Sequence, residues 1–279
     1  MLQYSIEAGI PMKSITKILK GTLAVILLIC VTSCGKNQAK INFEEAVTSL
    51  EAKNQELDSA VTDLKILLES EDKLLDMALP EQSAALIKNA DAVKVLPPEM
   101  GKGDEVIAGQ VSELNAVDYS TVITELKEMA ENMQTSIQQR KLVTNPPEEQ
   151  VMYRILTIEN ITAAEAVTEG SDPNGMLNKP GGYTSAIFFE CDLVPATTQF
   201  KGTSALEKGT PGGGCLEVYA SPEDAESRNA YLSTFDGRIF AAGKHAVIGT
   251  VVIRVSGEMK EQDQELMIQR LIEALTAPE

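Results

Sequence analysis

The sequence contains no tryptophan, one histidine, four cysteines and only 4% aromatic residues. Because proteins bind extended sugars largely by stacking them on aromatic rings, this scarcity argues against a large carbohydrate-binding surface. The single histidine, His245, and so few thiols cannot supply a cysteine zinc site or a disulfide scaffold. The chain also lacks the G-x-S-x-G motif, which argues against a serine hydrolase with a nucleophile elbow.

Basic residues are also scarce: 24 Lys and Arg face 41 Asp and Glu, for a formal net charge of −17. Such a balance repels nucleic acid phosphates and anionic lipid headgroups, so we expect no nucleic acid partner and no membrane contact through charge. The apolar fraction of 43% is ordinary for a folded protein.

An apolar run occupies Leu23–Val31, after three lysines between positions 12 and 20. Its length suits a signal-peptide core and is well short of the roughly 20 residues that span a bilayer. The run ends in VTSC, which is similar to a bacterial lipobox, so we predict thioether lipidation at Cys34. The alternative is an uncleaved signal anchor in which Cys30 and Cys34 are incidental apolar residues.

Lipidation at Cys34 would divide the N-terminal region into a removed segment, residues 1–33, and a polar tether, residues 34–40. The removed segment includes Met1 to Pro11, which we interpret as a mis-assigned start upstream of Met12. The mature chain would keep 21 basic and 40 acidic residues. We expect it to lie on the extracytoplasmic face of the cell membrane, attached by its lipid.

A helical heptad pattern begins at Phe43 and meets no Gly or Pro before Pro80, which predicts one continuous helix over that range. Asn54 interrupts the seam, where a polar residue commonly fixes register, although it would also be tolerated near a frayed end. The predicted seam positions are Val47, Leu50, Asn54, Leu57, Val61, Leu64, Leu68, Glu71, Leu75 and Ala78.

Further helices are predicted over residues 81–95, 104–114 and 118–141. Long amphipathic helices bury their apolar stripes against one another, so region 41–143 is expected to form an antiparallel helical hairpin or small bundle. A parallel coiled coil between two molecules would bury the same seams, which leaves a homo-oligomer open.

Region 147–279 follows a linker at Asn145-Pro146-Pro147, where Asn145 is a plausible N-cap. Alternating apolar residues predict strands over residues 161–168, 183–193, 215–220 and 246–255. Helices are expected after Ser221 and over residues 261–277. This order predicts an α+β fold class with a mostly antiparallel sheet.

The ordered motifs SDPNG, KPGGY, EKG, GGG and FDG between Pro147 and Leu275 resemble a C-terminal module of surface lipoproteins of Gram-positive bacteria such as clostridia and bifidobacteria. The resemblance implies surface display and supplies no catalytic residue. With it we expect a non-enzymatic surface protein without a cofactor, bound to the membrane by its lipid and to a protein or envelope ligand. The alternatives are a solute-binding lipoprotein of a transporter and an enzyme with an unfamiliar site near Asp172, Asn174 and Asp236.

Three weaker site hypotheses concern this module. Asp172 and Asn174 mimic two positions of a calcium-binding loop, but the chain lacks the anchoring carboxylates, so a turn is the simpler interpretation. Cys191 and Cys215 would pair as a disulfide or remain two buried thiols. Lys208 to Cys215 resembles a phosphate loop only superficially, because it runs into a strand rather than a helix.

Overall fold

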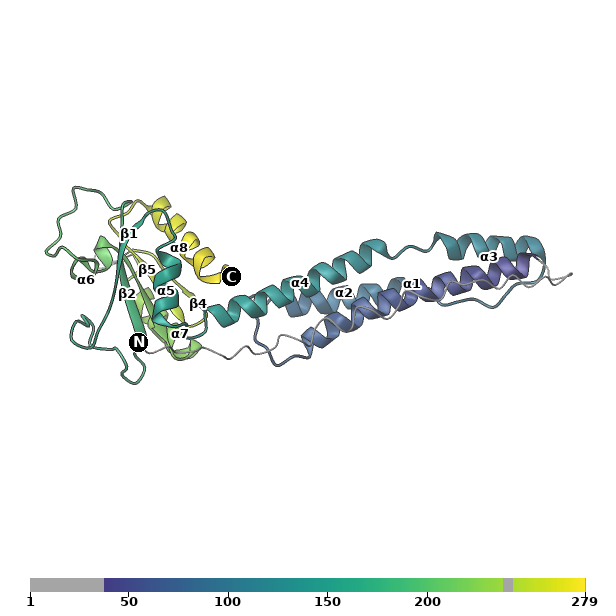
Figure 1. The fold of residues 1–279 in the computed structure, drawn as a ribbon, viewed down its shortest axis with the longest axis horizontal. Helices are drawn as coiled ribbons and strands as arrows, with labels where there is room; N and C mark the ends of the chain where they lie inside the picture. The colour runs from purple at the N-terminus through teal and green to yellow at the C-terminus, as the bar shows by residue number, and fades with distance from the viewer. Residues whose placement is uncertain (1–37, 238–242, 279) are drawn as a thin grey trace, which may run out of the picture.

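The computed structural model describes residues 38–237 and 243–278, and these form two parts of different shape (Figure 1). Residues 38–142 make a long helical stalk, and residues 148–278 make an α+β head at one end of it. The predicted fold class is confirmed: a helical N-terminal region precedes an antiparallel sheet. Cys34 lies outside the described residues, so its lipidation stays a prediction.

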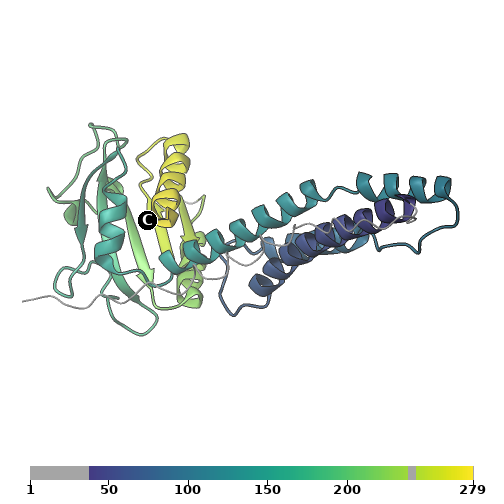
Figure 2. The same ribbon diagram turned by 45° about the vertical axis from the view of Figure 1, so that its right-hand side comes forward.

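The stalk consists of α1 (Gln38–Leu68), α2 (Leu79–Val93), α3 (Asp104–Ala116) and α4 (Ser120–Leu142). Near the far end of the stalk, Phe43 and Leu50 pack against Ile107 and Leu114 of α3. Further along α1, Leu57 and Leu64 share a core with residues of α4. Residue numbers increase in the same direction along α1 and along the α3 and α4 residues that it contacts. Helix α1 therefore runs parallel to α3 and α4 (Figures 1 and 2).

Helix α2 runs in the opposite direction and completes the bundle. Its Ser83 lies against Met133 of α4, and just after its end Lys94 forms an ion pair of 2.6 Å with Asp58 of α1. The prediction of a small bundle is therefore confirmed, whereas an antiparallel hairpin of the two long helices was wrong. The two long helices are parallel because α2, which lies between them in the sequence, runs back along the stalk in the opposite direction.

Helix α1 ends at Leu68, earlier than the sequence pattern predicted. Residues 69–72 place three carboxylates at the negative end of the helix dipole, which opposes further helix. The backbone amides of Leu75 and Asp76 then donate to Ser136 Oγ of α4, both at 2.9 Å, and hold a turn in place. The prediction of one helix to Pro80 was wrong, and three predicted seam positions lie outside α1: Glu71, Leu75 and Ala78.

Asn54 lies buried at the centre of the stalk, away from any frayed end. Its Nδ2 donates to Val95 O at 2.9 Å, and its Oδ1 accepts from the Tyr119 hydroxyl at 3.0 Å. The same hydroxyl accepts from Val95 N at 2.8 Å. Asn54 therefore joins α1, α4 and the segment after α2 in one position, as expected of a residue that sets register.

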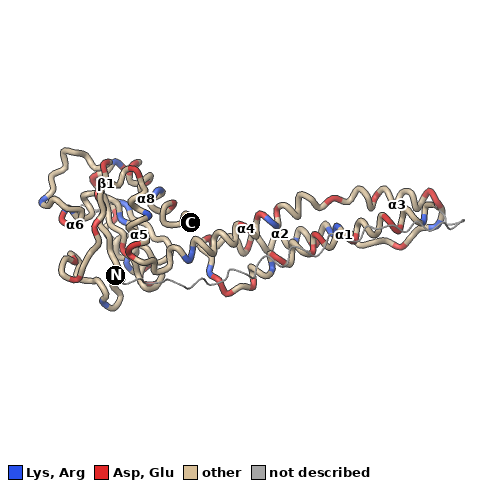
Figure 3. Tube along the Cα trace, viewed as in Figure 1, with Lys and Arg blue, Asp and Glu red and all other residues tan. Residues whose placement is uncertain are grey.

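Charged residues of both signs lie along the whole stalk (Figure 3). Alternating charge keeps the outer faces of the helices in water, while the leucine-rich faces are buried between them. No helix in the described ranges is long and apolar enough to cross a membrane.

The head begins with α5 (Glu148–Ile155) and contains a five-stranded antiparallel sheet in the order β1-β2-β3-β5-β4. The strands are β1 (Ile161–Ala166), β2 (Tyr183–Cys191), β3 (Gly213–Tyr219), β4 (His245–Ile248) and β5 (Val251–Val255). The other elements are α6 (Ala205–Lys208), the 3-10 turn η1 (Thr210–Gly212), α7 (Pro222–Ser233) and α8 (Glu261–Thr276).

Both faces of the sheet are covered. Residues such as Phe189 and Ile253 pack with α5 and α8 in one core, whereas Phe188 and Val252 pack with α6 and α7 in another. Consecutive strand residues therefore enter different cores, as the alternation of side chains along a strand requires. Ser221 caps α7 as predicted, with its hydroxyl accepting from Asp224 N.

The predicted single strand 246–255 is a hairpin. Ile248 pairs with Val251, so Gly249 and Thr250 form a two-residue turn between β4 and β5. Gly249 adopts a φ of +62°, which residues with a side chain rarely adopt, and this conformation permits the tight turn. Val247 consequently lies on the α7 face of the sheet, whereas Val251 lies on the α8 face.

The stalk joins the head through this hairpin turn. Val143 O accepts from Thr250 N at 2.8 Å, and Asn145 N donates to Thr250 Oγ1 at 2.7 Å. Asn145 has a φ of +44° and bonds to Thr184, so it is not the predicted N-cap; Pro147 precedes α5. The buried Val143 side chain packs in the core of the head and so attaches the head to the end of α4.

Candidate binding cavity beside helix α7

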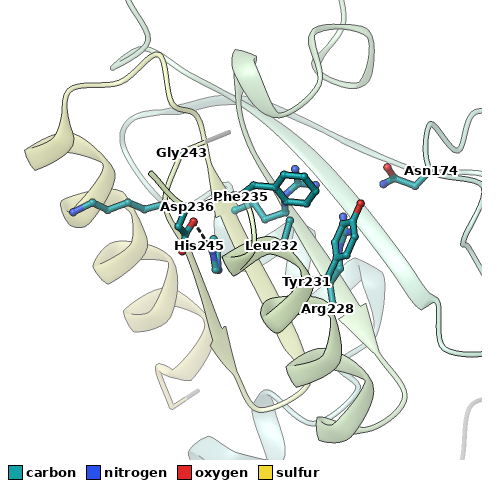
Figure 4. Close-up of a pocket in the computed structure, with 10 residues that line it drawn as sticks. Asn174, Arg228, Tyr231, Leu232, Phe235, Asp236, Gly243 and His245 are labelled. Carbon is teal, nitrogen blue, oxygen red and sulfur yellow. Dashed lines mark hydrogen bonds and ion pairs between the residues drawn. The ribbon is translucent and has the colours of Figure 1, made fainter. Parts of the chain in front are cut away.

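A cavity of about 280 Å³ opens beside α7 on the face of the sheet opposite α8 (Figure 4). We call it the arginine cavity. Its lining combines cationic, aromatic and amide side chains from α7, the strands β4 and β5, and the loop before β2. The lining residues are Asn174, Arg228, Tyr231, Leu232, Phe235, Asp236, Gly243, Lys244, His245 and Arg254.

The two arginines are held by one buried carboxylate, Glu217 of β3, whose side chain is fully buried. Arg228 Nε and Nη2 donate to its two oxygens at 2.7 and 2.8 Å, and Arg254 Nη1 donates at 3.1 Å. The Tyr219 hydroxyl adds a fourth bond at 2.9 Å. Glu217 is thus fully satisfied, and it fixes both guanidinium groups at the wall of the cavity.

These contacts keep the Glu217 carboxyl ionised. Burial alone would raise the pKa of Glu217, but the hydrogen bond and charge of Arg228 and the charge of Arg254 hold that pKa below its ordinary value. The same pairing overcomes the effect of burial on Arg228 and raises its pKa. The cluster therefore remains two cations around one anion at neutral pH.

An aromatic wall stands beside the arginines. The rings of Tyr231 and Phe235 meet edge to face with centroids 5.2 Å apart, and Arg228 lies 5.6 Å from the centroid of Tyr231. Tyr231 is 55% exposed, so its ring presents an apolar face to a ligand.

His245 begins the edge strand β4 and lies at one end of the cavity. Its Nδ1 lies 2.7 Å from Asn229 Oδ1, and its Nε2 lies 3.2 Å from Asp236 Oδ1 (Figure 4). Among the described lining residues there is no serine or cysteine for this histidine to activate. The side chains of Asn229, Asp236 and His245 thus form a hydrogen-bonded group at this end of the cavity.

The loop residues singled out in the sequence are only partly brought together. Asn174 and Asp236 both line the arginine cavity, whereas Asp172 does not. Asp172 instead accepts from Asn174 N at 2.9 Å and Leu177 N at 2.7 Å, and also from the Tyr183 hydroxyl. Its oxygens organise the turn, and no trio of acidic, His or Cys side chains suited to a metal occurs in the described part of the chain.

The disulfide alternative for Cys191 and Cys215 is corrected by the structure, in which both are free, buried thiols. Cys191 belongs to the core on the α8 face and Cys215 to the core on the α7 face, so the sheet separates them. Burial raises the pKa of Cys191 to about 11 and that of Cys215 well above its ordinary value, which leaves both unreactive.

The sequence hypotheses missed the arginine cluster, although a signal for it existed. Glu217 and Arg254 each lie between apolar residues of a strand, so both point away from the core of Leu216 and Ile253. Opposite charges on the same face of two strands predict an ion pair only if those strands are neighbours.

The segment from Lys208 leads through η1 into β3 and connects to a strand, as predicted, and not to a helix.

Comparison with known proteins identified no relative: no family model matches the chain, and no curated protein and no solved structure matches it. The resemblance of the head to Gram-positive surface lipoproteins therefore stays a prediction from its motifs.

Proposed function

We propose that the protein is a lipid-anchored, extracytoplasmic binding protein without enzymatic activity, in which the stalk holds the head away from the cell membrane. The observation that carries this proposal is the placement of the two ends. Helix α1 begins at Gln38, four positions after Cys34, at the end of the stalk far from the head (Figure 1). A lipid at Cys34 would thus leave the head at the outer end.

The dimensions of the stalk support the same function. A helix with the 31 residues of α1 is about 46 Å long. The arginine cavity lies in the head beyond that length, on rigid elements of the sheet and α7. A binding site displayed on a fixed spacer suits capture of a ligand at the cell surface, either a small molecule or a group carried by an envelope component.

Replacement of Cys34 tests the anchoring. In the native host, we expect Cys34→Ala to abolish incorporation of an alkyne-labelled fatty acid and to move the protein out of the detergent phase on partitioning. Cys30→Ala is the matched control, because it changes a cysteine in the same apolar run, and it should keep the label. Labelling that persists in Cys34→Ala would exclude the proposed anchor.

A further inference from the structure

We infer that the arginine cavity binds an anionic group, a carboxylate or phosphate, carried on a small planar apolar body. The inference rests on the proposed binding function and names the class of ligand. The site would differ from the chain as a whole, whose net charge of −17 repels anions. The cavity is a local exception because two guanidinium groups there face one buried carboxylate.

The charge of the cluster is not fully used within the protein. Glu217 neutralises one of the two arginines, which leaves one positive charge at the cavity wall. Arg254 donates to Glu217 only through Nη1, and its Nε and Nη2 donate to no residue in the described ranges. Two adjacent donors of a guanidinium form the fork that binds a carboxylate or phosphate with two parallel hydrogen bonds.

The other charged lining residues do not compete for that role. Lys244 is paired with Glu261 and Glu265 of α8, so its charge is already countered outside the cavity. Asp236 bonds to His245 and lies at the end of the cavity opposite Asn174 (Figure 4). The attraction for an anion therefore comes from the Nε and Nη2 donors of Arg254, which bond to no residue in the described part of the chain, because the formal charges of the two arginines are balanced by Glu217 and Asp236.

The remaining walls define the body of the ligand. Tyr231 and Phe235 offer apolar ring surfaces beside the guanidinium groups, which suits a planar group. Asn174, across the cavity from Tyr231, offers an amide for a polar substituent (Figure 4). The volume of about 280 Å³ is at the lower limit for ligand sites, so the site fits a molecule near the size of an aromatic acid.

Fluorine NMR with three probes that share a para-fluorophenyl ring tests this inference on the full chain in neutral detergent. The probes are para-fluorobenzoate, para-fluorophenyl phosphate and the cationic para-fluorobenzamidine. We expect saturable binding of one or both anions and none of the cation. Binding of benzoate alone assigns a carboxylate ligand, and binding of the phosphate alone assigns a phosphate. Equal binding of benzamidine, or no binding of either anion, would overturn the inference.

Variants locate the binding. Arg254→Gln should weaken the anion about tenfold by removing the fork, while Arg228 and Tyr219 still satisfy Glu217. Tyr231→Ala removes the ring wall without touching Glu217 and should also weaken binding. Arg270→Gln, the same kind of change on α8 outside the cavity, should leave it unaltered. Unchanged binding in both cavity variants would refute the site, whereas fatty-acid labelling that persists in Cys34→Ala would refute only the anchoring.

Discussion

Glu217 is the residue that connects the stability of the head with its cavity. It is fully buried and receives hydrogen bonds from Arg228, Arg254 and Tyr219. A carboxylate in this setting is stable only because its partners replace water, and the partners depend on it equally. Glu217 therefore makes the cavity rigid, and its loss would leave two partly buried arginines without a counter-ion.

Glu217→Gln should lower the free energy of unfolding by about 3–5 kcal/mol, because it leaves the two arginines partly buried without their counter-ion. The measurement is chemical denaturation followed by circular dichroism. Glu190→Gln on β2 is the control: Glu190 pairs with Lys208, and its side chain keeps 21% exposure. This control should cost clearly less, and an equal loss in both variants would contradict the special role of Glu217.

The same residue predicts a pH dependence. The pKa of Glu217 is lower in the folded protein than its ordinary value of 4.5, so the unfolded chain binds the proton more readily. Its contribution to stability is present above about pH 4.5 and is lost as the pH falls further, through the folded pKa. Unfolding curves between neutral pH and acid should show this loss in the native chain and a smaller one in Glu217→Gln.

Among the elements, α1 shows how a polar residue selects one packing of a helical bundle. The leucine seam would allow α1 to slide by a heptad or to pair with another chain. Asn54 allows only the position in which it meets both Val95 O and the Tyr119 hydroxyl. The buried amide thus specifies which helices are neighbours, whereas the leucines around it supply apolar burial that is not specific.

Asn54→Ala should destabilise the stalk by about 1–3 kcal/mol, because Val95 O and the Tyr119 hydroxyl lose a partner in a buried site. Thermal melting of the full chain measures the loss. Gln55→Ala, the next residue and exposed on α1, provides the control and should melt like the native chain. If both variants melted alike, Asn54 would have no part in fixing register.

For the whole molecule, the decisive contact is the one between stalk and head. The β4–β5 turn packs on the end of α4, where Gly249 approaches so closely that a side chain would overlap Val143 O. Thr250 bonds on both sides of this contact, to Val143 and Asn145. This hairpin turn therefore helps to set the direction of the stalk relative to the cavity, together with the contact between α4 and α8.

Thr250→Val should loosen this joint, since it removes the hydroxyl that accepts from Asn145 N at 2.7 Å. We expect faster hydrogen exchange at Asn145 and a broader distribution of lengths in small-angle X-ray scattering. Thr48→Val, on the exposed surface of α1, is the control and should preserve both properties. Unchanged exchange at Asn145 in Thr250→Val would show that other contacts hold the joint.

The sequence by itself determined the class of each half. Spacing of apolar residues decides between helix and strand locally, which is why the bundle, the antiparallel sheet and the capped start of α7 could be predicted. It also indicated Asn54, because a polar residue in an apolar seam is visible without coordinates. The proposal of lipidation at Cys34 likewise rests on a linear pattern.

Only the tertiary structure decided which segments meet. The turn that follows α1 depends on Ser136 of another helix, and the hairpin at Gly249 depends on contact with Val143. Whether Glu217 is a solvated charge or the centre of an arginine cluster depends on β3 and β5 being neighbours under α7. These are contacts between residues distant in the chain, and local periodicity carries no information about them.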